Sequence, residues 1–433
     1  MPEEFESYTR SLLGDELYQV LTDGLQQPTP VSIRLNPAVA NLNEWQLPED
    51  AERVPWSQYG FYLKGRPAFT FDPLFHAGAY YVQEASSMFA EFALREVLAR
   101  INQETTTVGA TPVTMLDLCA APGGKSTCAL SVLPEGSTLY ANEPNRQRAN
   151  ILAENLQKWQ LPTLAPSHHP TLAPSHLPTL HITNCYPRDY KKSKMLFDIV
   201  LADVPCSGEG MFRKDPAAIG EWSTANVEKC WRLQRDIIAD IWHCLRPGGY
   251  LLYSTCTFNA HENEENVHWI CHELGAEVIS LPINPAWGII NGLPMSFPTD
   301  GMYRFLPGRT RGEGLFMAVV RRPPLLSPQG GKNTLPPDKE IEQSFLNDIK
   351  KHIILPLGGK GEIGYSQALA FLRREAITLP PDTPRGPLVV SFQGLPLGMV
   401  KNIGNRANNL YPKEWRIKST HIPNEYEAIL KHS

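Results

Sequence analysis

The chain has 433 residues, of which 42% are hydrophobic and 20% charged, and its net charge is −5 at pH 7. This composition is typical of a folded protein with two or three domains and argues against wholesale disorder. No stretch approaches the roughly eighteen uninterrupted apolar residues of a membrane span, and the acidic residues 1–6 do not resemble a signal peptide. We therefore expect a cytoplasmic protein without membrane association, whose eight cysteines stay reduced.

The charge is unevenly distributed along the chain. Residues 1–105 carry 7 Lys/Arg against 15 Asp/Glu, whereas residues 341–433 carry 12 against 8. A basic C-terminal module on an acidic or neutral body is compatible with a local phosphate-binding surface. A solvated basic face would give the same count, so charge alone does not decide between the two.

The first 105 residues combine helical and strand patterns. Apolar residues recur at helical spacing from Phe5 to Leu21. After the breaks at Pro28 and Pro30, residues 31–36 alternate like a strand, and a second helix extends to about Arg100. We predict an N-terminal α+β accessory domain over residues 1–105, which packs on the next domain of the chain and binds RNA.

Residues 106–323 alternate strands with helices, which predicts an α/β domain with a doubly wound, mostly parallel, Rossmann-like sheet. The strands at 197–203 and 250–255 should be neighbours in it. The helix between them should run from Asn226 to Leu245, and Asn259 should open the next helix with Glu262 as its capping partner. The remaining predicted strands lie at 113–119, 137–143, 181–183 and 315–320, and the remaining helices begin near 122 and at 145.

Two segments interrupt this order. An eight-residue repeat occupies residues 161–176, and we interpret it as a tandem duplication in a surface loop, where insertions cost little. Residues 324–340 are rich in Pro and Gly and predict a linker to a small α+β module over residues 341–433.

We expect no metal site, although two histidine groups could suggest one. These are His168, His169 and His176 in the repeat, and His268 and His272 with Cys271 on one helix.

A glycine turn follows the first strand of the α/β domain, within residues 117–126. Such a turn lets a ligand approach the backbone at a helix N-terminus. Gly124-Lys125-Ser126 suggests a P-loop nucleotide hydrolase, but that loop needs glycine at position 119, where Cys119 stands. Glu143 closes the second strand, where an acid can bind ribose hydroxyls. The pattern favours a nucleoside ligand with little phosphate, such as S-adenosylmethionine (AdoMet).

Cys206 and Cys256 each come just after a buried strand. If these strands are neighbours, about 4.8 Å apart, both thiols can face one pocket at the edge of the sheet. A thiolate that adds to carbon 6 of cytosine makes carbon 5 nucleophilic enough to take a methyl group. A protonated carboxyl of Asp203 near ring nitrogen 3 would neutralise the charge that addition generates. The second thiol could help the first to leave, but the spacing does not say which of them attacks.

Together these motifs resemble the Nop/Sun family of RNA cytosine-C5 methyltransferases. The similarity covers residues 117–125, 203–210 and 254–264, and extends upstream to residues 83–88. Residues 397–415 are similar to the PUA-like RNA-binding tail of the bacterial 16S rRNA members. One departure is Val204, where the family usually has alanine.

The resemblance implies that Cys256 is the nucleophile, that Cys206 helps to release the product, and that Asp203 lines the base and cofactor pocket. The family also has an acid after the third strand, and the nearest candidate is Asp189. The implied AdoMet contacts are Cys119, Ala120, Ala121, Pro122, Gly123, Gly124, Lys125, Glu143, Asp189 and Asp203. The implied RNA contacts are Arg213, Lys214, Lys401 and Arg406.

The expected activity is thus methylation of an unpaired or flipped cytosine in RNA, with rRNA the first choice of substrate and tRNA the alternative. A DNA cytosine-C5 methyltransferase would attack through Cys206 instead, and would give Cys256 no role. A non-catalytic RNA-binding protein of ribosome assembly is a further alternative, which the two intact cysteines disfavour. We expect the protein to act as a monomer.

Overall fold

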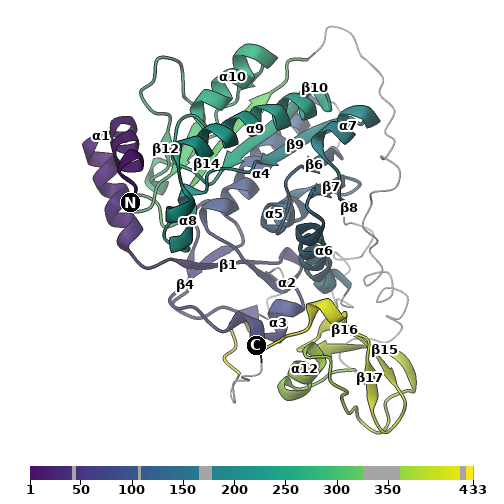
Figure 1. Cartoon of the computed structure of the whole chain (residues 1–433). Coiled ribbons are helices and arrows are strands. Elements are labelled where there is room, and N and C mark those ends of the chain that lie inside the picture. The colour runs from purple at the N-terminus through teal and green to yellow at the C-terminus, as the bar shows by residue number, and fades with distance from the viewer. Residues whose placement is uncertain (41–44, 106–108, 165–177, 325–360, 420–425, 433) are drawn as a thin grey trace.

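The structure is a computed structural model of the whole chain (Figure 1), and it describes residues 1–433 except 41–44, 106–108, 165–177, 325–360, 420–425 and 433. Most of the 161–176 repeat with its three histidines, and all but the first residue of the predicted 324–340 linker, lie outside the described residues. Within the described part, no helix is long and apolar enough to cross a membrane.

A nine-stranded sheet forms the centre of the described structure. Five parallel strands lie in the order β8-β7-β6-β9-β10, and they comprise Thr179–Thr183, Thr138–Asn142, Thr114–Asp117, Phe197–Asp203 and Leu245–Thr255. The antiparallel strands β14 (Leu315–Arg321), β13 (Met302–Phe305) and β12 (Ile290–Asn291) extend the sheet beyond β10, and β11 (Glu277–Val278) pairs with β14. The predicted mixed α/β, Rossmann-like architecture is confirmed, and so is the pairing of β9 with β10.

Helices cover both faces of this sheet (Figure 1). One face packs against α4 (Phe89–Glu104), α5 (Gly124–Val132) and α6 (Arg146–Gln160). The other packs against α7 (Pro187–Ser193), α9 (Thr224–Trp242) and α10 (Glu264–Leu274). Because parallel strands buried on both faces must be apolar throughout, β9 and β10 have the continuous hydrophobic runs from which they were predicted.

Two predicted helix boundaries are wrong. Helix α9 ends at Trp242 rather than Leu245, because Leu245 already pairs with Phe197 as the first residue of β10. Helix α10 begins at Glu264 rather than near Asn259. The Asn259 side chain does accept a hydrogen bond from the Glu262 backbone, at 2.9 Å. However, the Glu262 carboxylate turns inward to other partners, so the chain makes a turn here before the helix starts.

The N-terminal region begins with α1 (Glu3–Gln26), which bends at Gly14, where φ is +74°. A small sheet in the order β3-β4-β1-β5 comes next, made of Glu52–Arg53, Gly60–Leu63, Val31–Leu35 and Tyr80–Val82. The fully buried Arg34 on β1 donates hydrogen bonds to Thr127 and Ser131 of α5. The N-terminal region is therefore joined to the helix that follows the glycine turn. The short elements nearby are α2 (Pro37–Ala40), β2 (Trp45–Gln46) and α3 (Pro73–His76).

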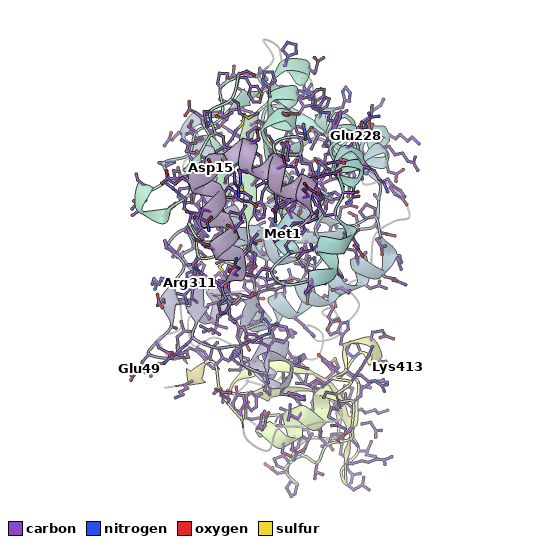
Figure 2. All side chains as sticks on the ribbon, turned by 60° about the vertical axis from the view of Figure 1, so that its left-hand side comes forward. Met1, Asp15, Glu49, Glu228, Arg311 and Lys413 are labelled. Carbon is purple, nitrogen blue, oxygen red and sulfur yellow. The ribbon has the colours of Figure 1, made fainter. Side chains whose placement is uncertain are left out.

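The C-terminal module packs on the N-terminal region. It contains α12 (Tyr365–Leu372) and an antiparallel sheet of β15 (Gly386–Phe392), β16 (Leu395–Asn402) and β17 (Ala407–Asn409). Its apolar residues share one core with β1 and α3, and β18 (Lys431–His432) pairs with β2. Figure 2 shows this module, marked by Lys413, at the end of the molecule away from Glu228 of α9.

A buried ion pair joins the edge of the large sheet to α10. Arg304 on β13 and Glu264 at the start of α10 are 1% and 0% exposed, and Arg304 also donates to the carbonyl oxygen of Phe258. Removing one partner of such a pair leaves an uncompensated buried charge.

We predict that Arg304→Met lowers the free energy of unfolding by about 3–5 kcal/mol, as measured by urea denaturation. The double variant Arg304→Met with Glu264→Leu should recover much of the loss, because it buries no lone charge. A loss below about 1 kcal/mol in the single variant, the range of an exposed pair, would contradict this.

Candidate active site

The two cysteines from which the site was predicted lie in contact. Register pairing places Ser254 of β10 opposite Asp203 of β9, so the loops that follow these strands leave the sheet side by side. The sulfur atoms of Cys206 and Cys256 are 3.2 Å apart. Both residues are free thiols and partly exposed, so a substrate can reach them.

The environment makes the two thiols unequal. The hydrogen bond to Cys256, followed by burial, holds the pKa of the Cys206 thiol well above its usual range. Either sulfur can be the donor in this contact. A thiolate is the form of cysteine that attacks carbon atoms, so a Cys206 thiol with a raised pKa is poorly suited to attack.

Asp203 lies at the same edge, held by two donors. The Lys125 ammonium is 2.9 Å from one carboxylate oxygen, and the Ser254 hydroxyl donates to the other at 2.7 Å. Burial lowers the pKa of Lys125, but the Asp203 carboxylate, and to a smaller extent a Cys256 thiolate, more than reverse this, so the pKa is raised. Lys125, predicted as a cofactor contact, is thus a cation at the thiol pair. An ammonium here stabilises a thiolate.

Two buried carboxylates fix the cysteine loops, and the sequence reasoning gave neither of them this role. Glu262 accepts hydrogen bonds from the Ser207 backbone at 3.0 Å, from Gln234 at 2.7 Å and from the Asn259 amide at 2.8 Å. Burial, opposed by these hydrogen bonds, raises the pKa of Glu262. Because Ser207 follows Cys206 directly, this carboxylate sets the position of the Cys206 loop.

Glu209 holds the other loop. Its carboxylate accepts from the backbone of Phe258 and Asn259 at 2.5 and 3.0 Å, and from the indole of Trp222 at 2.9 Å. The backbone of Gly210 in turn donates to the carbonyl oxygen of Cys256 at 2.8 Å. The sequence did contain a signal for these two carboxylates. Glu209 lies three residues after Cys206 and Glu262 six residues after Cys256, and both belong to the motifs that resemble the family.

The predicted cofactor loop leaves β6 beside this pair. Cys119 and the buried residues Ala120 and Ala121 lead through Pro122 into α5. Gly123 has φ of +115°, and a Cβ atom there would lie 3.3 Å from Leu152, so the turn requires glycine. This brings the backbone of residues 119–124 and the N-terminus of α5 to the carboxyl edge of the sheet, where open α/β folds bind ligands.

Asp117, which precedes the loop, is completely buried and incompletely paired. Ser126 donates to one carboxylate oxygen at 2.6 Å, whereas the other oxygen, Oδ1, has no hydrogen-bond partner among the described residues. Burial raises the pKa of Asp117 to about 7, against the hydrogen bond from Ser126, which lowers it. The unpaired oxygen is a ready acceptor for a ligand that brings a donor.

Glu143, Asn184 and Asp189 lie near the ends of β7 and β8. One Glu143 oxygen accepts from the Asn145 backbone at 2.9 Å, and the other pairs with Arg148 at 3.3 Å. Asp189 caps α7 by accepting from the Tyr186 backbone at 2.9 Å. Asn184, by contrast, donates to the carbonyl oxygen of Glu143 at 2.6 Å. Asn184 was not predicted as a site residue from the sequence. It is therefore a second candidate, beside Asp189, for the cofactor contact expected after the third strand.

The predicted RNA contacts differ in accessibility. Lys214, Lys401 and Arg406 are exposed. The prediction for Arg213 is corrected: its side chain is 5% exposed, pairs with Glu313 at 2.9 Å and donates to the carbonyl oxygen of Gly24. Arg213 therefore fixes α1 to the body of the protein, and its guanidinium is not presented to solvent.

The histidines of α10 have packing partners. His268 stacks on Phe297, with ring centroids 4.1 Å apart, and His272 lies 2.9 Å from the Glu273 carboxylate. Among the residues that the structure describes, no group of three or more His, Cys, Asp or Glu side chains could hold a metal ion.

Comparison with known proteins identifies the family. Residues 110–321 match the family described as 16S rRNA methyltransferase RsmB/F, and residues 1–85 and 360–417 match the N-terminal and PUA domains of RsmF. The Ribosomal RNA small subunit methyltransferase F of Pectobacterium atrosepticum is 30% identical over 81% of this chain and 70% of its own length. The chain belongs to the RsmB/F family of 16S rRNA methyltransferases. The resemblance predicted from the motifs, PUA domain included, is confirmed.

Other relatives fit this family assignment. The methyltransferase F of Enterobacter sp. strain 638 is 27% identical over 95% of both chains. That of Pectobacterium carotovorum is 31% identical over 76% of this chain, which spans 65% of the relative's length. Two solved structures from Pyrococcus horikoshii share the fold: a methyltransferase homologue (TM-score 0.58, 24% identity, 74% of this chain and 95% of that one) and NSun6 with SFG (TM-score 0.54, 19% identity, 74% and 98%).

We predict that the buried carboxyl of Asp117 makes stability fall as pH rises, in protein without cofactor. Its pKa is about 7 when folded and about 3.9 when unfolded, so only the folded state keeps the proton in between. The contribution of Asp117 to the free energy of unfolding is fully present below about pH 4 and is lost as the pH rises toward 7. The free energy of unfolding falls by up to about 1.4 kcal/mol per pH unit in this range.

Asp117→Asn removes this titration and keeps an acceptor for Ser126. Thermal unfolding at pH 5 and pH 7.5 should show the variant gaining stability relative to wild type at the higher pH. Asp236→Asn, an exposed change on α9, is the control and should show no such gain. A pH-independent difference between wild type and Asp117→Asn would contradict the prediction.

Proposed function

We propose that the protein transfers a methyl group from AdoMet to carbon 5 of a cytosine in RNA, with 16S rRNA as the substrate. The observation that carries the proposal is the pair of thiols with sulfur atoms 3.2 Å apart, at the edge of the sheet where Asp203 and Lys125 also lie. A methyltransferase that acts on a nitrogen or an oxygen atom needs no thiol. One that acts on cytosine carbon 5 needs a nucleophile for carbon 6 and a base for the carbon 5 proton.

The residues at the β6 edge fit AdoMet. The turn at Gly123 exposes backbone without a phosphate cradle, and Asp117 offers an unpaired buried oxygen for a donor group. Glu143 directly follows the next strand, β7. Residues 119–124 with Glu143 would hold the cofactor, with Asn184 or Asp189 beside it. The similar Pyrococcus horikoshii NSun6 was solved with SFG, an analogue of AdoMet. When bound, AdoMet supplies an electrophilic methyl group on a sulfonium.

Cys256 would begin the reaction. Its thiolate adds to carbon 6, which forms a sulfur–carbon bond and moves electron density to carbon 5, the atom that takes the methyl group. Addition also places negative charge at ring nitrogen 3. The Lys125–Asp203 pair can supply a proton there, from the ammonium through the carboxylate, and take it back when the adduct collapses. In this scheme the Lys125 ammonium, 2.9 Å from Asp203, takes the place of the lone protonated Asp203 carboxyl that was expected to be the proton source.

Cys206 would end the reaction. Once the Cys256 sulfur is bonded to carbon, it is no longer an anion, and the strongest effect that raises the pKa of Cys206 is gone. Cys206 can then lose its proton to solvent and, as a thiolate, take the proton on carbon 5. Removing that proton restores the ring double bond and expels the Cys256 thiolate, so that both thiols return to their starting state.

We predict that Cys256→Ala lowers methyl transfer from tritium-labelled AdoMet by at least about a thousandfold, because the attacking atom is lost. In the Cys206→Ala variant, Cys256 should still attack cytosine. This variant should therefore accumulate a covalent protein–RNA adduct that survives denaturing gel electrophoresis. Cys271→Ala, on α10 and outside the site, is the matched control and should behave as wild type.

The target atom is tested separately. Bisulfite sequencing of 16S rRNA from cells with and without this chain should reveal one cytosine that is protected only when the chain is present. Full activity of Cys256→Ala would refute the mechanism, and a methylated product without C5-methylcytosine would refute the assigned position. A protected cytosine in tRNA and none in 16S rRNA would show that the substrate is tRNA.

A further inference from the structure

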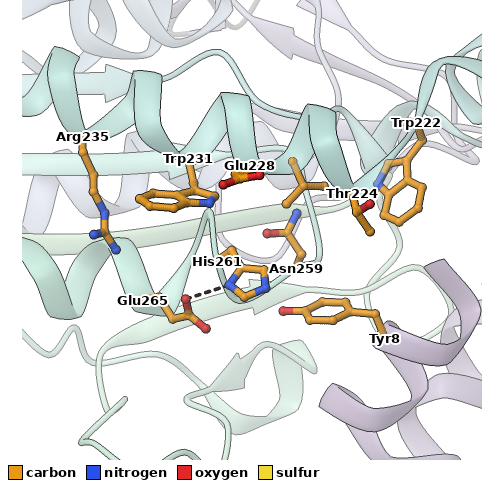
Figure 3. A pocket seen from close by; sticks show the side chains of 10 residues that line it. Tyr8, Trp222, Thr224, Glu228, Trp231, Arg235, Asn259, His261 and Glu265 are labelled. Carbon is orange, nitrogen blue, oxygen red and sulfur yellow. Dashed lines mark hydrogen bonds and ion pairs between the residues drawn. The ribbon is translucent and has the colours of Figure 1, made fainter. Parts of the chain in front are cut away.

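A pocket of about 450 Å³ lies beside the segment from Asn259 to Glu265, which begins three residues after Cys256 (Figure 3). It is bounded by α1, by Trp222, by α9 from Thr224 to Arg235 and by the segment from Asn259 to Glu265. Its volume falls in the range of about 300–1,000 Å³ that is usual for small-ligand sites. The thiol pair and the cofactor loop do not line this pocket, so the mechanism above gives it no role.

Aromatic rings line the pocket. Figure 3 shows Trp231 on the α9 side, with His261 and Tyr8 on the opposite side. The rings of Tyr8 and His261 are stacked, with centroids 5.4 Å apart and planes 27° from parallel. The Arg235 guanidinium lies 4.4 Å from the centre of the Trp231 ring. Flat rings on both sides of an opening suit a flat, aromatic ligand, because every nucleobase offers a face for stacking.

Two carboxylates, Glu228 and Glu265, border the pocket. One oxygen of Glu265 lies 2.8 Å from the His261 ring and one oxygen of Glu228 accepts from Arg232, so the second oxygen of each carboxylate can accept from a ligand. Carboxylates also accept hydrogen bonds from the exocyclic amino groups and ring N–H groups of bases. Arg235, at one end, could meet the backbone of a strand whose base is inserted.

The pocket is tied to the active site through its walls. The Ala260 backbone, four residues after Cys256, donates to the Tyr8 hydroxyl at 3.0 Å. Asn259, which also lines the pocket, donates to both carboxylates that fix the cysteine loops, Glu209 at 3.1 Å and Glu262 at 2.8 Å. An occupant would therefore rest on the segment that follows the nucleophile.

We propose that this pocket binds an unpaired nucleobase of the substrate RNA, one that lies near the methylated cytosine. The inference rests on the proposed function for the identity of the target, but not for the binding itself. Stacking between Trp231 and the Tyr8–His261 pair holds the base, and the second oxygens of Glu228 and Glu265 accept from its donor edge. The base thereby places the RNA strand relative to Cys256.

The test compares RNA binding by Trp231→Ala and Trp231→Phe. Without AdoMet, Trp231→Ala should weaken the binding of protein-free 16S rRNA by about tenfold or more, the effect of losing one base–aromatic stack. Trp231→Phe keeps a ring and should retain most of the affinity. In methyl transfer, KM should rise in Trp231→Ala while kcat stays within about twofold, because the site of chemistry is untouched. Leu233→Ala, exposed on the same helix but outside the pocket, is the control.

Ultraviolet crosslinking of the wild-type protein to the same RNA gives a second readout that needs no variant. Peptides that contain Tyr8, Trp231 or His261 should carry nucleotide adducts. Unchanged affinity in a folded Trp231→Ala protein, or RNA crosslinks elsewhere but none in these peptides, would overturn the proposal. Crosslinks from the pocket to a ribosomal protein, when small subunits replace the RNA, would show that it serves another partner.

These outcomes are separable from the fate of the proposed function. If Trp231→Ala loses affinity but wild-type protein makes no C5-methylcytosine, the pocket stands and the proposed reaction is wrong. If wild-type protein makes C5-methylcytosine through Cys256 and Trp231→Ala binds as wild type does, the reaction stands and the pocket does not bind a base.

Discussion

The contact between the sulfurs of Cys206 and Cys256 is the constraint on which the site depends. Two thiols fifty residues apart can share a proton only if two strands end in register and two loops keep a fixed distance. The parallel pairing of β9 with β10 supplies the register. The buried carboxylates of Glu209 and Glu262 supply the distance, because each accepts hydrogen bonds from the backbone of one loop and from the Asn259 side chain.

The rest of the molecule supports this edge of the sheet. Arg34 joins the N-terminal region to α5, and Tyr8 of α1 contacts the loop that follows Cys256. The C-terminal module shares its core with the N-terminal region, so Lys401 and Arg406 are presented from a body that is itself fixed to the catalytic domain. If these exposed cations bind RNA as proposed, the packing of the two regions would orient that RNA relative to the thiols.

The sequence predicted the parts of this architecture that depend on local pattern. The apolar runs before Asp203 and Cys256 predicted the two strands and their pairing. The motifs predicted the family. Contacts between distant residues were not predictable in this way. Glu262 looked like the capping partner of Asn259, but it turns inward to a backbone group fifty-five residues away. Arg213 looked like a free surface cation, because nothing local shows that Glu313 pairs with it.

The central claim is that Cys256 attacks and Cys206 releases, and RNA containing 5-fluorocytosine tests it most directly. Fluorine on carbon 5 cannot leave as a proton does, so a methylated adduct formed by the attacking sulfur is trapped on the protein. Mass spectrometry of the digested complex should place the nucleotide on Cys256 in wild-type protein and in Cys206→Ala, and find none in Cys256→Ala. A nucleotide on Cys206 in wild-type protein would contradict the account.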